Sequence, residues 1–116
     1  MRKRGEIWLA DLTPRRGTEP GKTRPVVVVQ AQALLDAGHP STLIVPLTTQ
    51  LVDDAEPLRV RIRAAGKLKK DSDALVDQVR AIDNARLVQG PLSRLQSPQL
   101  IALDRALLDV FDLPSA

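Results

Sequence analysis

Polar side chains stand at the ends of two strongly apolar segments of this 116-residue sequence. Arg24 opens the run RPVVVVQ, directly after a polar segment, and Thr48 lies near the end of TLIVPLTT. A guanidinium can stabilise charge that builds up on a phosphate, and a hydroxyl can hold a reacting group in place. Each also has a structural interpretation, because arginine before proline is often a solvated edge residue and threonine is a good strand former. From these residues alone both interpretations stay open.

A third polar group, Asp77, Gln78 and Arg80, lies among apolar residues further along the chain. Amide and carboxylate edges can read unpaired bases, and a cation can contact phosphate. The structural alternative is an ion pair between Asp77 and Arg80, which would stabilise the fold only weakly.

Basic residues form two groups that could contact phosphate. The first surrounds an exposed loop at residues 13–23, and the second follows residue 58; their members are Arg15, Arg16, Lys22 and Arg24, then Arg59, Arg61, Arg63, Lys67, Lys69 and Lys70. The alternative is a charged exterior in which nearby acids neutralise the second group, namely Asp53, Asp54, Glu56, Asp71 and Asp73. A net charge of +3 permits polyanion binding without requiring it.

The composition excludes several kinds of site. The sequence has no cysteine and one histidine, so thiolate catalysis and zinc sites built on Cys or several His are excluded, and a metal site would have to be all-carboxylate. Only Trp8 and Phe111 could stack a base, which excludes an aromatic RNA-binding platform. No Ser-His-Asp or phosphate-loop spacing is present.

Short strands must position these residues. Apolar and β-branched runs predict strands at 6–12, 24–30, 42–49, 58–62, 74–82 and 86–88, with a bend or bulge at Pro46. In the strand at 58–62, Leu58, Val60 and Ile62 should share one face. A helical turn and a loop should fill residues 31–41.

One amphipathic helix is expected to close the chain. Ser97 should be its N-cap with Pro98 as its first residue, and apolar residues follow at three- and four-residue spacing: Leu100, Leu103, Leu107, Val110 and Phe111. We therefore expect a single β-rich (α+β) domain over 1–116. The longest apolar run, at 25–29, is strand-sized and no secretory signal is evident, so we expect a cytoplasmic protein with no membrane span.

A set of segments in fixed order resembles the MazF/PemK (Kid) family of type II toxin endoribonucleases. They are RGEIWLADLTP at 4–14, GTE at 17–19, KTRPVVVVQ at 22–30, IVPLTTQ at 44–50, DSDALVDQVRAID at 71–83 and RL at 86–87. The resemblance implies a small SH3-like antiparallel β-barrel with a C-terminal α-helix. It also implies a homodimer that is neutralised by a small antitoxin with an acidic tail.

The implied reaction is cleavage of single-stranded RNA, with mRNA the expected target, by attack of the 2′-OH on the adjacent phosphorus. It requires no metal and no cofactor. Arg24 matches the family's catalytic arginine, with phosphate stabilisation and proton donation as its expected roles, and Thr48 matches the strand-end hydroxyl that positions reacting groups. The expected RNA-binding residues are Thr18, Glu19, Lys22, Gln78 and Arg80.

One branch of the family that the sequence resembles has a His/Arg/Asp arrangement for the acid, base and phosphate roles. The sequence departs from that branch at two positions. Thr18 stands where that branch has His, and Leu75 where it has Arg. Asp77 matches the Asp and is assigned an orienting or structural role, so Arg24 and Thr48 are the expected catalytic pair.

Two other functions stay open at this point. A related barrel occurs in toxins resembling CcdB, which poison DNA gyrase by contact, and an inactive homologue would bind only RNA or antitoxin. Retention of KTRP and PLTTQ favours the enzyme.

Overall fold

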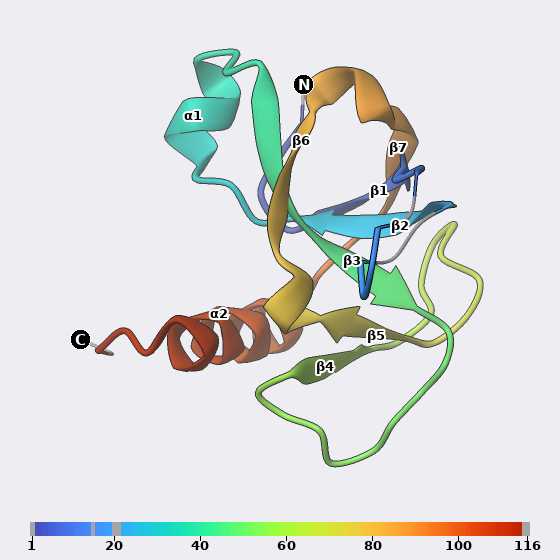
Figure 1. Ribbon diagram of the computed structural model, residues 1–116, viewed down its shortest axis with the longest axis vertical. Helices are drawn as coiled ribbons and strands as arrows, with labels where there is room; N and C mark the ends of the chain where they lie inside the picture. The colour runs from blue at the N-terminus through green and yellow to red at the C-terminus, as the bar shows by residue number, and fades with distance from the viewer. Residues whose placement is uncertain (1, 15, 20–21, 115–116) are drawn as a thin grey trace.

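The computed structural model describes residues 2–14, 16–19 and 22–114 (Figure 1). Its strands are β1 (Glu6–Asp11), β2 (Thr23–Val28), β3 (Ser41–Thr48), β4 (Arg59–Ile62), β5 (Ser72–Leu75), β6 (Arg80–Asp83) and β7 (Leu87–Arg94). Its helices are α1 (Gln32–Asp36), the 3₁₀ turns η1 (Val76–Gln78) and η2 (Asn84–Arg86), and α2 (Ser97–Phe111). The predicted β-rich domain with a C-terminal helix is confirmed.

The strands form one antiparallel sheet in the order β4-β5-β3-β2-β1-β7, with β6 also paired to β3. One edge of β3 pairs with β2, while its other edge pairs with β6 at Ser41–Ile44 and with β5 at Leu47–Thr48. Strands β4 and β7 stand at the two ends of this path. Among the described residues the sheet is therefore strongly bent but not closed.

Pro46 occupies the point at which β3 changes partner. The N–H and C=O of Leu43 face the β2 side, so alternate residues such as Pro46 face the opposite edge. On that edge, pairing with β6 ends at Ile44 and pairing with β5 begins at Leu47, so the missing N–H of proline leaves no ladder bond broken. The predicted bulge is wrong, because β3 keeps continuous register with β2 through Pro46.

Two predicted strands differ from the structure. The segment 74–82 is interrupted by η1, which turns the chain from β5 into β6 so that both can pair with β3. The sequence did not predict this turn, because the segment is mostly apolar and the turn contains no Gly or Pro. β7 continues through Gly90 to Arg94, and a Cβ at Gly90 would overlap the Trp8 ring, so only glycine fits there.

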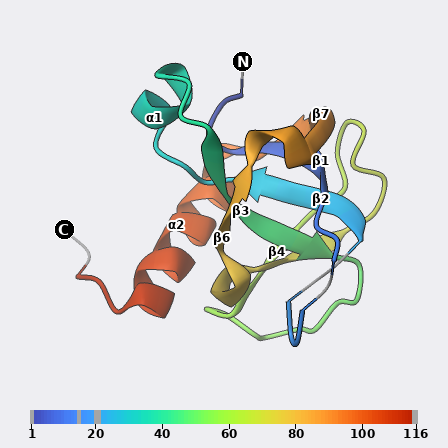
Figure 2. The same cartoon turned by 45° about the horizontal axis from the view of Figure 1, so that its top comes forward.

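Period-two alternation sends neighbouring residues into two apolar clusters. Val27 and Val45 belong to a larger cluster, whereas Val26 and Ile44 belong to a smaller one on the opposite face of the same strands. Val60 and Ile62 of β4 join the larger cluster as predicted, but Leu58 precedes β4 and is 52% exposed. Figure 2 shows β2 and β3 crossing the middle of the molecule, with α1 near one end and the β1–β2 loop near the other.

Helix α2 packs on the larger cluster through Leu103 and Ala106. Its N-cap is Gln96 rather than the predicted Ser97, because Gln96 and Gln99 exchange side-chain and backbone hydrogen bonds in a capping box. Phe111, expected on the apolar face, is 55% exposed. None of the helices in the described part of the chain has the length and apolar character of a membrane span.

Candidate functional site

A groove of about 850 Å³ opens where β2 begins and β3 ends. Arg24 and Thr48 both line it. The β2–β3 register pairs Val26 with Pro46, and two further residues along the same ladder place Arg24 opposite Thr48. Antiparallel pairing thus brings together two polar residues that stand 24 positions apart in the sequence. The other lining residues are Thr13, Thr18, Lys22, Pro25, Leu47, Thr49, Gln50, Arg59 and Leu75.

Arg24 is half-buried at the wall of this groove. Its Nη1 donates to the carbonyl oxygen of Leu47 at 3.3 Å, which ties the guanidinium to the last residues of β3. A guanidinium carries five N–H donors in a planar fork, and such a group forms strong charge-assisted hydrogen bonds to phosphate oxygens.

Thr48, also half-buried, ends β3 and begins a turn. Its Oγ1 accepts the backbone N–H of Gln50 at 3.2 Å. A hydroxyl that accepts in this way still has its own hydrogen to donate. Thr48 can therefore donate to an oxygen of a group bound beside Arg24.

A smaller cavity of about 290 Å³ adjoins the groove. Asp77 and Gln78 line it, and it shares Thr18, Arg59 and Leu75 with the groove. The structure thus brings Thr18, Lys22, Gln78 and Asp77 to the same surface as Arg24 and Thr48.

Glu19 and Arg80 are joined to each other by an ion pair of 3.2 Å between Arg80 Nη1 and Glu19 Oε2. This pair ties the β1–β2 loop to the first residue of β6. Within the described part of the chain, no hydrogen bond or ion pair joins Asp77 to Arg80, and Asp77 is exposed. The alternative ion pair considered from the sequence is therefore replaced by one to the loop.

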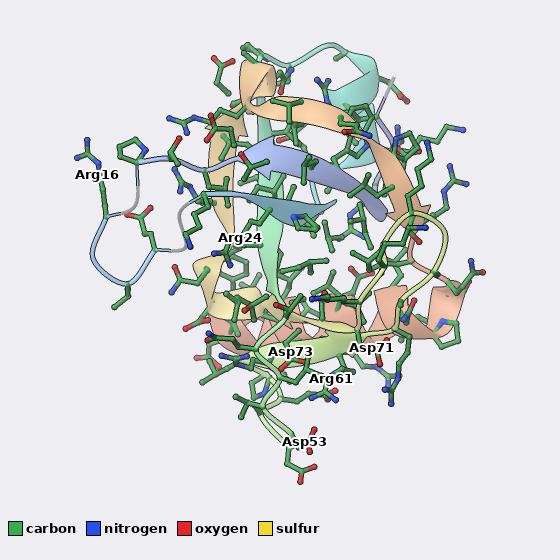
Figure 3. All side chains as sticks on the ribbon, turned by 90° about the vertical axis from the view of Figure 1, so that its right-hand side faces the viewer. Arg16, Arg24, Asp53, Arg61, Asp71 and Asp73 are labelled. Atoms are coloured by element: carbon green, nitrogen blue, oxygen red, sulfur yellow. The ribbon has the colours of Figure 1, made fainter. Side chains whose placement is uncertain are left out.

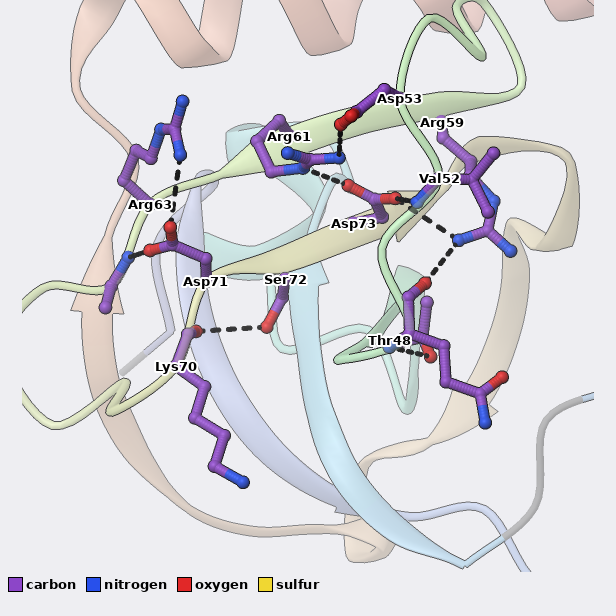
Figure 4. A network of polar contacts seen from close by, with 12 residues as sticks. Thr48, Val52, Asp53, Arg59, Arg61, Arg63, Lys70, Asp71, Ser72 and Asp73 are labelled. Carbon is purple, nitrogen blue, oxygen red and sulfur yellow. Dashed lines mark hydrogen bonds and ion pairs between the residues drawn. The ribbon is translucent and has the colours of Figure 1, made fainter.

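Arg59, which the sequence indicated only as one member of the second basic group, lines both the groove and the smaller cavity. Its Nη1 donates to the carbonyl oxygen of Gln50 at 2.8 Å and to Oδ2 of Asp73 at 3.2 Å (Figure 4). Asp73 is the centre of this network, because its 1% exposed side chain also accepts from Arg61 Nε and from the N–H of Val52. Burial by itself would raise the pKa of Asp73, but hydrogen bonds from Arg61, Val52 and Arg59 outweigh it and hold the pKa below its usual value.

Several other basic residues are occupied elsewhere. Arg61 binds Asp53 and Asp73, and Arg63 binds Asp71, which supports the structural interpretation of those arginines. Arg16 lies on the β1–β2 loop, far from Arg24 (Figure 3), and Arg15 lies outside the described residues.

Trp8, one of the two candidate stacking residues, is occupied within the fold. Its Nε1 donates to Glu6 Oε1 at 3.1 Å, and the Arg2 guanidinium carbon lies 5.3 Å from its ring centroid. It does not line the groove. Among the described residues, no three His, Asp or Glu side chains gather as a metal site would require.

Comparisons with known proteins agree on one family. The profile of the PemK-like, MazF-like toxins of type II toxin-antitoxin systems matches residues 3–111. The chain is 39% identical over 111 residues to the endoribonuclease MazF of Staphylococcus epidermidis, which covers 92% of this chain and 88% of that relative.

Solved structures show the same fold. The Mycobacterium tuberculosis toxin MazF-mt6 superposes with a TM-score of 0.77 at 23% identity, covering 95% of this chain and 99% of that one. MazF of Deinococcus radiodurans gives 0.78 at 20% identity, covering 97% of each chain. A mycobacterial endoribonuclease in complex with its cognate antitoxin gives 0.77 at 18% identity, covering 100% of each chain.

Proposed function

Because the chain belongs to the PemK-like, MazF-like toxin family and is an endoribonuclease of that family, we propose that it cuts single-stranded RNA without a metal ion. The expected target is mRNA, cut at a short recognised sequence, and the outcome is inhibition of translation and growth. One observation carries the catalytic assignment: Arg24 and Thr48 line the same groove from adjacent antiparallel strands.

The reaction is an internal transesterification. The RNA 2′-OH gives its proton to water and attacks the adjacent phosphorus. The bond from phosphorus to the 5′ oxygen breaks, and that oxygen takes up a proton from Arg24, which regains one from water. The products are a 2′,3′-cyclic phosphate and a 5′-OH. Arg24 stabilises the additional negative charge on the phosphate and is a proton donor for the 5′ oxygen, while Thr48 positions the phosphate by donating its hydroxyl hydrogen.

The linings of the groove and the smaller cavity support the proposed RNA-binding roles. Thr18 and Gln78 supply hydrogen-bonding groups for base edges, and Lys22 supplies a cation for phosphate. We retain Glu19 and Arg80 as RNA-binding residues that also hold the loop, since their ion pair is partly exposed and open to exchange. Asp77 is assigned an orienting role at the smaller cavity.

We further propose a homodimer and an antitoxin with an acidic tail. Relatives have been solved as a MazE-MazF pair and as an endoribonuclease with its cognate antitoxin. Lys22, Arg24 and Arg59 line the groove, and their positive charge suits an extended acidic segment. Since its RNA substrate and its antitoxin are made in the cytoplasm, we place its action there, and we class the bent sheet with the SH3-like barrels.

The first experiment is incubation of the purified protein with a long single-stranded RNA in excess EDTA, with mapping of 5′-OH ends. We expect cuts at a recurring short sequence by the wild type and none by Arg24→Ala. A matched control is Arg105→Ala, because Arg105 is exposed on α2 and lines neither the groove nor the smaller cavity.

Each contrary outcome has a definite meaning. Loss of cleavage in EDTA would contradict the metal-free mechanism, and an unfolded Arg24→Ala would contradict the catalytic assignment. Intact RNA with a well-folded wild type would support an inactive homologue or a gyrase-poisoning toxin, neither of which the comparisons favour.

A further inference from the structure

We propose that Arg59 is a phosphate-binding residue of the RNA groove, contacting a substrate phosphate next to the one that is cut. This inference rests on the proposed ribonuclease function. It concerns a residue that the family motifs did not indicate and that the fold brings to the reaction groove.

The position of Arg59 is the first argument. It lines the groove that holds Arg24 and Thr48, and it also lines the smaller cavity that holds Asp77 and Gln78. The groove and the smaller cavity share Thr18, Arg59 and Leu75, and Arg59 is the cation among these three. The backbone of an RNA strand carries a negative charge at every nucleotide, so a cation at the junction would meet a phosphate.

The hydrogen bonds of Arg59 are the second argument. Its two bonds to Gln50 and Asp73 both start from Nη1. Nε and Nη2 form no hydrogen bond to any described residue, so three of the five N–H donors remain for a ligand. The side chain is 25% exposed, so it is held in place and still accessible to the groove. A fixed guanidinium loses little conformational freedom when it binds an anion.

The position of the neighbouring carboxylate is the third argument. Asp73 is 1% exposed and lines neither the groove nor the smaller cavity. It lines a separate cavity together with Arg59 and Arg61, so its contact with Arg59 lies outside the groove. Asp73 forms ion pairs with both Arg59 and Arg61 (Figure 4), so its single negative charge does not neutralise Arg59 alone. The Arg59 guanidinium therefore keeps positive charge for the groove, as a phosphate contact requires.

Arg61 provides a matched control. It stands two residues along β4, so it shares the outward face with Arg59, and it also binds Asp73. Unlike Arg59, it lines neither the groove nor the smaller cavity. Arg59→Gln and Arg61→Gln therefore remove the same charge and the same kind of contact to Asp73, but only the first changes the RNA surface.

The test measures binding of a 2′-O-methyl copy of an RNA that the wild type cuts, at several salt concentrations. We expect Arg59→Gln to raise Kd about tenfold for every sequence bound and to reduce the salt slope by about 0.7, the contribution of one phosphate contact on a single strand. Arg61→Gln should keep the wild-type slope, and Arg59→Lys, which retains the charge, should recover most of it. Circular dichroism and thermal unfolding verify that each variant is folded.

The outcomes separate this inference from the proposed function. If the wild type cuts and binds RNA but Arg59→Gln behaves like the wild type or like Arg61→Gln, the phosphate contact is wrong and the ribonuclease stands. A second result would also overturn the phosphate contact. In that case Arg59→Gln does not fold, while Arg59→Lys folds but shows the reduced salt slope expected when one phosphate contact is lost. If the wild type neither cuts nor binds RNA, both proposals fail.

Discussion

The hydroxyl oxygen of Thr48 accepts a hydrogen bond from the backbone N–H of Gln50. The hydroxyl hydrogen is not used in this bond. No described acid or histidine is hydrogen-bonded to that hydroxyl. A neutral hydroxyl is a poor proton acceptor, because its protonated form is a strong acid. Its chemistry is therefore that of a hydrogen-bond donor to the phosphate, beside the cation of Arg24.

This role predicts different results for two substitutions of Thr48. Thr48→Val removes the hydroxyl but keeps the β-branched shape, so we expect single-turnover cleavage to fall roughly a hundredfold, as for loss of one donor to a charged transition state. Thr48→Ser keeps the hydroxyl and should stay close to the wild-type rate. Equal rates for the two variants would show that the hydroxyl does not take part.

At the scale of elements, the β4–β5 hairpin and the loop that precedes it are held by Asp73. The β4–β5 register pairs Asp73 with Arg61, and the carboxylate also reaches the N–H of Val52 in the loop. The same carboxylate holds Arg59 at the groove. A single buried acid thus connects the stability of the hairpin to the shape of the groove.

Acid unfolding should report this connection. The folded pKa of Asp73 is lowered, so its stabilisation is complete above the unfolded pKa of about 3.9 and is lost as pH falls through the folded value. We expect Asp73→Asn to lower the free energy of unfolding at neutral pH by roughly 1–3 kcal/mol and to weaken its dependence on pH below about pH 4. Urea unfolding at several pH values measures both effects.

Asp54→Asn is the control for that experiment. Asp54 is exposed on the same loop with a φ of 55°, a conformation that asparagine adopts readily. It removes the same charge without touching the network, so stability and its pH dependence should stay unchanged. An equal change in both variants would mean that net charge, not the buried carboxylate, controls the acid response.

At the scale of the whole molecule, apolar surface remains uncovered. Nine large apolar side chains among the described residues are more than 40% exposed, including Leu51, Val52 and Leu58 around the loop that precedes β4. Apolar side chains that gather in one exposed patch are typical of surfaces that a partner covers. We expect the partner subunit of the proposed homodimer to cover this loop.

Light scattering after size exclusion measures the assembly directly. We expect a mass of twice the 12.7 kDa chain, and we expect specific RNA cleavage to fall when the protein is diluted below its dimerisation constant. Full activity in a sample that is monomeric throughout would contradict a dimeric active form. An acidic peptide added in excess should inhibit cleavage less at high salt, because the groove cations attract it electrostatically.

The sequence by itself determined most of the strands and indicated the polar residues at their ends. Alternation of apolar residues was sufficient for Val60 and Ile62, because a strand buries every second side chain whatever its neighbours are. Helical spacing was sufficient for α2, although its cap was misplaced by one residue. Arg24 and Thr48 were recognised as candidates from their places at the ends of strands, as well as from the family motifs.

Only the tertiary structure decided which cations face the groove. Arg59 and Arg61 have the same place in the alternating pattern, and nothing local separates them. Strand register alone would place Arg61 beside Thr48, because both pair with Asp73. The side chain that reaches the groove is nevertheless that of Arg59, which donates to the carbonyl oxygen of Gln50 just beyond β3. The Glu19–Arg80 pair was also invisible in the sequence, because contacts between distant segments depend on strand register and not on local periodicity. The same holds for η1, whose turn is set by the pairing of both β5 and β6 with β3.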